Sequence, residues 1–170
     1  MADAGLFANE RVELLDGTIV TMSPHTTHHA AVLQRLAKSL SRGLAAELDV
    51  RTQLPIVLDD WSEPEPDVVV CRADPRDYEI AHPRPADVVL VCEVAVSSVV
   101  FDRTQKAAAY AASGITTYWI VDVEARTIHV LEDPDPASRR YRRAQRFTDG
   151  ASISAPGGTV LAVTGLLPSR

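Results

Sequence analysis

The sequence predicts an α/β or α+β fold, in which a mixed β-sheet is flanked by two main helices and preceded by a β-hairpin. Two segments carry apolar residues at helical spacing, several short runs are rich in β-branched residues, and a turn signal separates two such runs near the start of the chain. These segments follow one another as hairpin, helix, strands, helix and strands, without repeats or a linker. We therefore expect a single domain over residues 1–170.

The hairpin is predicted at residues 11–22, where Asp16-Gly17 separates two β-prone runs. Asp-Gly is a strong signal for a tight turn between antiparallel strands. A helix should follow, because Thr26 or Thr27 can cap its N-terminus and apolar residues then recur three or four positions apart. That apolar stripe consists of Val32 or Leu33, Leu36, Leu40, Leu44 and Leu48.

The strands of the sheet are predicted from apolar runs bounded by turn residues. They are residues 50–58, 67–71, 87–96, 115–121 and 127–131, followed by weaker candidates at 141–147 and 159–163. Residues 133–136, with two prolines, are expected to form a loop. A second helix is predicted at 101–113, with Gly114 as the left-handed residue after its end. Its alanines would let it lie close to the sheet.

The composition is that of an ordinary soluble globular protein, with 46% apolar and 24% charged residues. No run of 18 apolar residues is present, so a membrane span is not expected. Cys71 and Cys92 both lie in apolar, strand-like runs and are expected to be buried, reduced thiols. Reduced thiols favour a cytoplasmic location.

The net charge of −6 and the pI of about 5.3 argue against a protein that binds nucleic acid through a general positive charge. A local basic patch is still present in the segment 139–146, which contains five arginines. In a strand, such a run forms either a solvated edge that prevents aggregation or a contact surface for nucleic acid. Both alternatives remain open at this point.

Glu93 interrupts the most apolar strand. Side chains alternate along a strand, so Glu93 should share a face with Val89, Val91 and Ala95, whereas Cys92 and Val94 face the other way. A glutamate in this position costs free energy unless it is paired, solvated or bound to a metal.

Asp67 opens the other strongly apolar strand. If the two strands are neighbours, Asp67 and Glu93 could jointly hold a hard divalent cation such as Mg²⁺, with their oxygens within about 7 Å of each other. The alternatives are turn chemistry at Asp67, which follows Pro66, and simple solvent exposure of Glu93.

Lys106 is one of only two lysines among 17 basic residues, the other being Lys38. Arginine is the usual cation of this chain, so a lysine suggests a task that needs a compact ammonium group. Lys106 either forms a surface pair with Asp102, four residues before it, or points into the same pocket as Glu93. In the pocket case we expect the two charges within about 10 Å, and a Lys106→Met variant to lose activity with little effect on stability.

His25, His28 and His29 form a separate cluster before the first helix. His25 and His29 have the i, i+4 spacing of zinc ligands on a helix, but Pro24 and the capping residues place His25 outside the helix. His29 is expected to line a site or to start the helix. A metal-binding protein that uses this cluster is a third possible function.

Several short motifs together resemble a known family. They are Val12-Glu-Leu-Leu-Asp-Gly17, Met22-Ser-Pro24 with His29, Pro66-Asp67-Val-Val, Glu93-Val94, and Asp102, Lys106, Tyr110 and Gly114 followed by Tyr118-Trp-Ile-Val-Asp122. In this order and spacing the sequence resembles the Uma2 family of putative restriction endonucleases, a branch of the PD-(D/E)XK nuclease superfamily, over roughly residues 10–165.

The resemblance implies a restriction-endonuclease-like core and a set of site residues. Asp67 matches the aspartate of the "PD" motif and Glu93 the acid of "(D/E)XK". Ala95 stands where the motif usually has lysine, and Lys106 on the following helix matches the displaced lysine of the family. Glu13 matches a further acidic position. Asp67, Glu93 and the carbonyl of Val94 would then bind Mg²⁺ or Mn²⁺.

The expected function is therefore metal-dependent hydrolysis of phosphodiester bonds in DNA. The segment 93–98 departs from the family, because it lacks a proline and its link to Asp102 is one residue short. This departure keeps open a catalytically degenerate module that binds nucleic acid or takes part in an assembly. A homodimer is expected because cutting both strands of a duplex takes two sites, and Tyr118 and Trp119 are expected to be exposed aromatics that support it.

Overall fold

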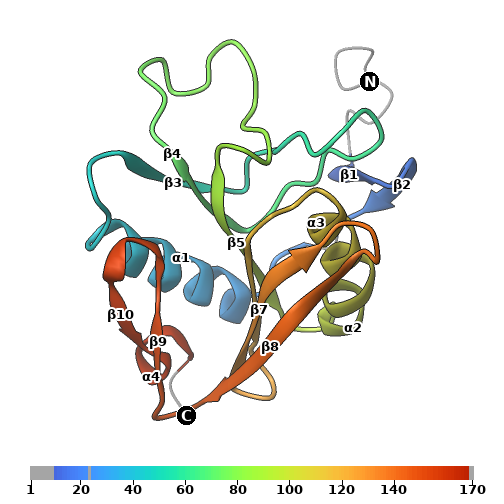
Figure 1. Ribbon diagram of the computed structural model, residues 1–170. Coiled ribbons are helices and arrows are strands. Elements are labelled where there is room, and N and C mark those ends of the chain that lie inside the picture. The colour runs from blue at the N-terminus through green and yellow to red at the C-terminus, as the bar shows by residue number, and fades with distance from the viewer. Residues whose placement is uncertain (1–9, 23, 169–170) are drawn as a thin grey trace.

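The centre of the fold is a six-stranded mixed sheet with the strand order β3-β4-β5-β6-β7-β8 (Figure 1). A computed structural model describes residues 10–22 and 24–168 of the chain, so Ser23 of the Met22-Ser-Pro24 motif lies outside the described residues. The strands are β3 (Leu48–Thr52), β4 (Val68–Arg72), β5 (Val88–Ala95), β6 (Thr117–Asp122), β7 (Thr127–Asp135) and β8 (Arg140–Thr148). Within this sheet β5 and β6 are parallel, and the other neighbours are antiparallel. The predicted α+β class is confirmed.

The predicted hairpin is confirmed as β1 (Val12–Leu15) and β2 (Thr18–Thr21). Asp16 and Gly17 both have positive φ, 48° and 75°, which is the backbone conformation of a tight type I′ turn. The hairpin forms its own small sheet, and Leu14 pairs with Glu63 of the following loop. This pairing holds β1 beside the main sheet.

Helix α1 (Thr27–Ser41) begins as predicted, because the Thr26 side chain accepts a hydrogen bond from the backbone N–H of His29. Its buried face consists of Val32, Leu33, Leu36 and Leu40. The predicted stripe is wrong beyond this point, since Leu44 follows the helix and Leu48 begins β3. The chain passes close to the C-terminal segment here, and a Cβ at Gly43 would lie 2.0 Å from Thr159 Oγ1.

The second helix starts earlier than predicted and contains a wide turn. It runs as α2 (Val99–Phe101), a π-helical turn η2 (Asp102–Lys106) and α3 (Ala107–Ala112). In the wide turn the backbone N–H of Ala107 donates to the carbonyl of Asp102, five residues back. Gly114 has φ of +77° and ends the helix as expected.

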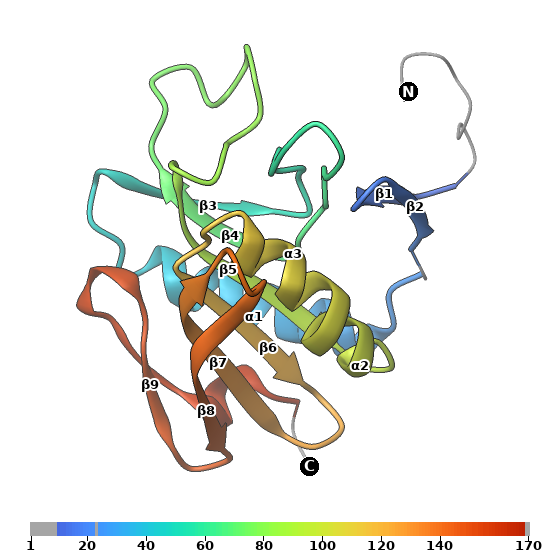
Figure 2. The same ribbon diagram turned by 45° about the vertical axis from the view of Figure 1, so that its right-hand side comes forward.

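The two helices cover opposite faces of the sheet (Figure 2). Cys92 and Val94 pack on the α1 side, whereas Val91 and Ala95 pack on the α3 side, as strand alternation predicts. Val89 packs on the α1 side, contrary to the prediction, because the β4–β5 register shifts by a bulge near Val70 and Cys71.

The aromatic residues of β6 correct another prediction. Tyr118 and Trp119 were expected to be exposed, but both have no accessible surface, because β6 is central and its two faces lie under opposite cores. They therefore give no support to a dimer interface. Cys71 and Cys92 are buried free thiols, as predicted.

The C-terminal part differs most from the prediction. β7 extends to Asp135, into the expected loop 133–136, whereas β3 covers only the first part of the predicted strand 50–58. The remaining elements are β9 (Ser152–Ser154), a short 3₁₀ turn η3 (Pro156–Gly158), β10 (Val160–Ala162) and α4 (Val163–Leu166), of which only β10 was predicted. None of the helices in residues 10–22 and 24–168 has the length and apolar character needed to cross a membrane.

Candidate functional site

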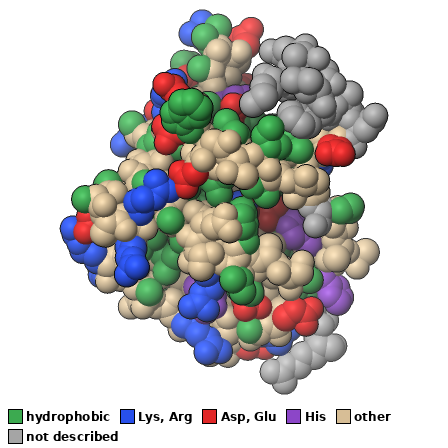
Figure 3. Space-filling model, turned by 90° about the vertical axis from the view of Figure 1, so that its right-hand side faces the viewer, with side chains coloured by type: hydrophobic (Ala, Val, Ile, Leu, Met, Phe, Trp, Pro, Cys, Tyr) green, Lys and Arg blue, Asp and Glu red, His purple; other side chains and the backbone are tan. Residues whose placement is uncertain are grey.

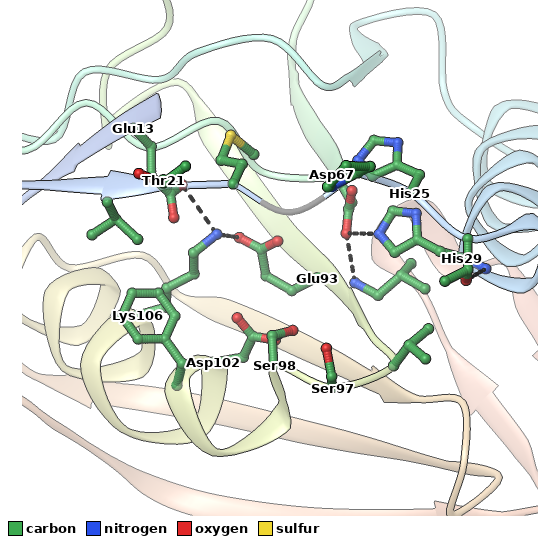
Figure 4. Close-up of a pocket in the computed structure, with 17 residues that line it drawn as sticks. Glu13, Thr21, His25, His29, Asp67, Glu93, Ser97, Ser98, Asp102 and Lys106 are labelled. Carbon is green, nitrogen blue, oxygen red and sulfur yellow. Dashed lines mark hydrogen bonds and ion pairs between the residues drawn. The ribbon is translucent and has the colours of Figure 1, made fainter. Parts of the chain in front are cut away.

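A cavity of about 290 Å³ lies where the N-terminal hairpin, the start of α1, the end of β5 and the wide helical turn meet (Figure 4). Glu13, Asp67, Glu93, Val94 and Lys106 all line it, so the structure brings together every site residue expected from the sequence. Asp102 lines it as well. We call this cavity, with its carboxylates at positions 13, 67, 93 and 102 and its single lysine, the carboxylate pocket.

Asp67 and Glu93 are neighbours because their strands are neighbours. β4 and β5 are antiparallel with Val68 opposite Cys92, which places Asp67, just before β4, beside Glu93. The backbone N–H of Val94 donates to Asp67 Oδ2 at 2.8 Å and holds the carboxylate against β5. The condition that the two strands pair, on which the predicted cation site depends, is thus met.

Lys106 points into the pocket, as the pocket alternative predicted. Its Nζ lies 2.8 Å from Glu93 Oε1 and 3.1 Å from Glu13 Oε2, and only 5% of the lysine is exposed. The hydroxyl of Tyr110 also donates to Glu93 Oε1, at 2.9 Å. The ammonium of Lys106 therefore connects the second helix to β1 through Glu13 and to β5 through Glu93.

The alternative surface pair between Asp102 and Lys106 is wrong, because both residues are buried. Asp102 is only 3% exposed and accepts a hydrogen bond from the Ser98 hydroxyl at 2.6 Å. The wide turn orients both side chains toward the cavity rather than toward water.

The pocket holds more negative than positive groups. Four buried carboxylates face one buried ammonium. Burial raises the pKa of Glu93 well above its ordinary value against the opposing effect of Lys106, and burial also raises the pKa of Asp102. Burial alone would lower the pKa of Lys106, but Glu93 and Glu13 raise it overall, so the lysine stays charged. A cation would relieve the excess of carboxylates.

Asp67 differs from the other acids of the pocket. Burial would raise its pKa, but the hydrogen bond and charge of His29, the N–H of Val94 and the charge of Lys106 together hold its pKa below the ordinary value. Asp67 is therefore ionised near neutral pH. An ionised oxygen donor beside Glu93 suits a hard divalent cation.

Histidines border Asp67 on its other side. His29, in the first turn of α1, places Nε2 2.9 Å from Asp67 Oδ2, and the His25 ring stacks on His29 at 4.3 Å. Ligand atoms of His25, His29 and Asp67 lie within 4.8 Å of one another. His25 precedes the helix and His29 lines the cavity, as predicted, whereas His28 is exposed and takes no part in this group.

The contact between the histidines and Asp67 could not be predicted from the sequence. The contact joins residues 38 positions apart and depends on how α1 packs beside β4, which no local pattern shows. Gln53 was also missed, although its Nε2 lies 3.3 Å from Asp67 Oδ1 and 3.0 Å from His25 Nε2. The one available signal was the density of histidine around the cap of a helix.

The arginine-rich segment forms β8, an edge strand of the sheet. Its arginines are exposed, and two of them lie near acidic residues of β7: Arg142 Nη2 is 3.2 Å from Asp135, and Arg143 Nη2 is 3.8 Å from Glu132. In Figure 3, basic side chains gather at the left and lower parts of the view, and the larger histidine groups lie to the right. The exposed, charged edge agrees with the first alternative, a solvated edge that prevents aggregation. Contact of this segment with nucleic acid stays a prediction.

Comparisons with known proteins identify a family and agree with the fold. The model of a family named Uma2, described as "Putative restriction endonuclease", matches residues 6–164. A solved structure described as a "putative nuclease belonging to DUF820" from Anabaena variabilis is similar with a TM-score of 0.71 and 15% identity, over 94% of this chain and 91% of that chain. At this identity the likeness shows the fold alone. The comparison with curated proteins finds no match.

Proposed function

Because the chain belongs to the Uma2 family, we propose that it is a metal-dependent endonuclease that hydrolyses phosphodiester bonds of DNA. The observation that carries the proposal is the carboxylate pocket, in which Asp67 and Glu93 lie beside each other and a buried lysine points at Glu93. The family and the fold support a nuclease. The dependence on a metal and the DNA substrate go beyond the family and the fold and are proposed here.

The residues of the pocket fit a divalent cation. Asp67 and Glu93 offer carboxylate oxygens, and the excess of buried acids over basic groups favours a bound positive charge. Together with the carbonyl of Val94, they would hold Mg²⁺ or Mn²⁺, both of which prefer oxygen ligands. When bound, such an ion would stabilise negative charge on a phosphate oxygen and lower the pKa of a water molecule.

The chain's own residues would position the substrate and the charges around it. Lys106, whose pKa is raised by Glu93 and Glu13 against the effect of burial, would act as a fixed positive charge near the phosphate and not as a proton acceptor. Glu13 and Tyr110 would hold Lys106 and Glu93 in place through their contacts of 3.1 and 2.9 Å. In the reaction, a water oxygen bonds to phosphorus, one ester P–O bond breaks, and the leaving oxygen takes up a proton.

A nuclease assay on plasmid DNA with Mg²⁺ and with Mn²⁺ tests the proposal. Cleavage should require the metal, stop with a chelator, and fall at least about 100-fold in Glu93→Gln and Asp67→Asn, since a ligand or transition-state contact is removed. Glu132→Gln, which changes an acid at the partly exposed edge of β7, is the control and should cleave like the wild type. Equal cleavage by wild type and Glu93→Gln would contradict the assignment.

A second candidate is a catalytically degenerate module that binds nucleic acid or takes part in an assembly. It is favoured by the segment 93–98, which lacks the family's proline at the edge of the pocket, and by the net charge of −6. Calorimetry distinguishes the two functions. An active site should bind Mg²⁺ in the wild type and lose this binding in Glu93→Ala, whereas a degenerate module should show no such difference.

The proposal also includes a homodimer, a cytoplasmic location and one domain over residues 1–170. Two copies would supply one site for each strand of a duplex. Buried free thiols at Cys71 and Cys92 support a reducing compartment. Light scattering at micromolar concentration tests the dimer, and a monomeric mass would contradict it.

A further inference from the structure

We propose that His25, His29 and Asp67 form a second cation position, which binds a transition metal that accepts imidazole nitrogen, such as Zn²⁺ and, less tightly, Mn²⁺, in preference to Mg²⁺. The position lies on the side of Asp67 away from Glu93 and Lys106, as Figure 4 shows. It shares Asp67 with the proposed nuclease site, but its occupancy does not require nuclease activity.

Two of the three donor atoms already have the separation of neighbouring metal ligands. Two ligands at about 2.1 Å from an ion and about 90° apart are separated by about 3.0 Å. His29 Nε2 and Asp67 Oδ2 are 2.9 Å apart, and the third ligand atom, from His25, lies within 4.8 Å of both. An ion could therefore replace the proton between His29 and Asp67 without a shift of the backbone.

The surroundings of His29 leave its ring free to act as a ligand. Nε2 contacts Asp67, while Nδ1 is buried and has no hydrogen-bond partner among the described residues. No partner therefore fixes the tautomer of the ring, and the proton can move from Nε2 to Nδ1 when an ion takes its place. The N-terminal cap of α1 at Thr26 fixes the position of the helical turn that carries His29.

His25 is the most exposed ligand of the three. Its Nε2 lies 3.0 Å from Gln53 Nε2 and 3.1 Å from Arg11 Nη1, and both contacts are exposed. These side chains must move aside when His25 binds an ion; Arg11 also pairs with Glu65, and Gln53 also contacts Asp67. Neither Arg11 nor Gln53 belongs to the two buried cores.

The ligand set determines which metal is preferred. Imidazole nitrogen suits zinc, copper, iron and nickel, whereas Mg²⁺ prefers an all-oxygen site. The Asp67–Glu93 side of the pocket offers oxygen ligands only, and the histidine side offers two nitrogens and one oxygen. The two sides should therefore differ in selectivity although they share one carboxylate.

Electron spin echo measurements on tag-free protein loaded with Mn²⁺ test this position directly, because bound imidazole gives ¹⁴N modulation. We expect ¹⁴N modulation in the wild type and its loss in His29→Gln, with Mn²⁺ and Zn²⁺ affinities lowered at least about tenfold by calorimetry and Mg²⁺ affinity nearly unchanged. His25→Gln, at an exposed position, should also lower both affinities. His28→Gln is the matched control, because His28 is an exposed neighbour outside the group.

Two results would overturn the inference. One is the absence of ¹⁴N modulation in the Mn²⁺-loaded wild type, and the other is equal Mn²⁺ affinity in His29→Gln and His28→Gln when circular dichroism shows both folded. Glu93→Gln separates the inference from the proposed function, because it should stop cleavage and retain the ¹⁴N modulation. If the wild-type protein cuts no DNA but shows ¹⁴N modulation from bound imidazole, the proposed nuclease activity is wrong and the second cation position is supported.

Discussion

The carboxylate pocket and the edge of the sheet at β7 and β8 contain similar charged groups in opposite environments. In the pocket, Lys106 and Glu93 are 5% and 4% exposed and lie 2.8 Å apart. At the edge, the side chains of Arg143 and Glu132 are 66% and 33% exposed and lie 3.8 Å apart. We call the charged pairs between these two strands the β7–β8 ladder; it comprises Glu132, Asp133, Asp135, Arg142 and Arg143.

The difference shows that burial, more than the number of ion pairs, determines how much a charged group affects the stability of the fold. In the ladder each ion keeps most of its water, so pairing contributes little to stability and serves mainly to keep the edge strand from pairing with another sheet. In the pocket the ions have lost their water, and each one depends on its neighbours.

Lys106→Met should cause the largest loss. The sequence alone suggested little effect on stability even for a lysine in the pocket, on the assumption that no buried packing would be lost, but Lys106 is buried and paired with Glu93 and Glu13. Removal of one partner from a buried ion pair leaves uncompensated charge and typically costs about 3–5 kcal/mol. Urea denaturation at pH 7 measures the change in the free energy of unfolding.

Lys38→Met is the matched control for this prediction, because Lys38 is the chain's other lysine and lies exposed in the last turn of α1. It should cost less than about 1 kcal/mol, mainly through the lost interaction with the helix dipole. Mg²⁺ should restore part of the stability of Lys106→Met, since an ion can replace the missing ammonium. Equal losses in the two variants would show that the pocket charges are not coupled as described.

Asp102→Asn should change how stability depends on pH. Burial raises the pKa of Asp102, so the folded state keeps a proton that the unfolded chain has already lost. Its contribution to stability is therefore full below about pH 4 and declines as the pH rises through the folded pKa. The asparagine variant can still accept the hydrogen bond from Ser98 and should show a shallower decline.

Urea denaturation between pH 4 and pH 8 compares the slopes of the wild type and Asp102→Asn. Asp60→Asn, at an exposed loop position, provides the control and should leave the wild-type slope unchanged. If Asp102→Asn has a steeper decline than the wild type, the direction of the pKa shift assigned to Asp102 is wrong.

Arg143→Met should have the smallest effect. Its ion pair with Glu132 is solvated, and such pairs contribute about 0–1 kcal/mol, less at high salt. The free energy of unfolding, measured at low and high salt, should differ from the wild type by less than this amount. A loss of unfolding free energy as large as that of Lys106→Met would show that the ladder and the pocket do not differ in the way proposed.

The parts that the sequence predicted depend on local patterns. Asp67 and Glu93 could be located because acids interrupt apolar strands only at a cost, and their pairing needed only that two strands be neighbours. The direction of Lys106 followed from the rarity of lysine and the short link between β5 and the second helix. The resemblance to a family supplied Glu13, which no periodicity distinguishes.

The parts that were missed depend on contacts between distant segments. Pro134 suggested a loop, but β7 pairs with β6 only as far as Glu132, so the proline lies where the strand has a free side and its missing N–H costs nothing. The pairing of His29 with Asp67 and the burial of Asp102 arise from packing between elements. No pattern of neighbouring residues in the sequence indicates either of them.

The wide turn at Asp102–Lys106 bears on how the length of this chain can change over evolutionary time. A π-helical turn contains one residue more than an α-helical turn and is accommodated by a local widening of the helix. A one-residue deletion within this turn would be absorbed by its return to α-helical geometry. Tyr110, whose hydroxyl lies 2.9 Å from Glu93, would then keep its place beside that glutamate.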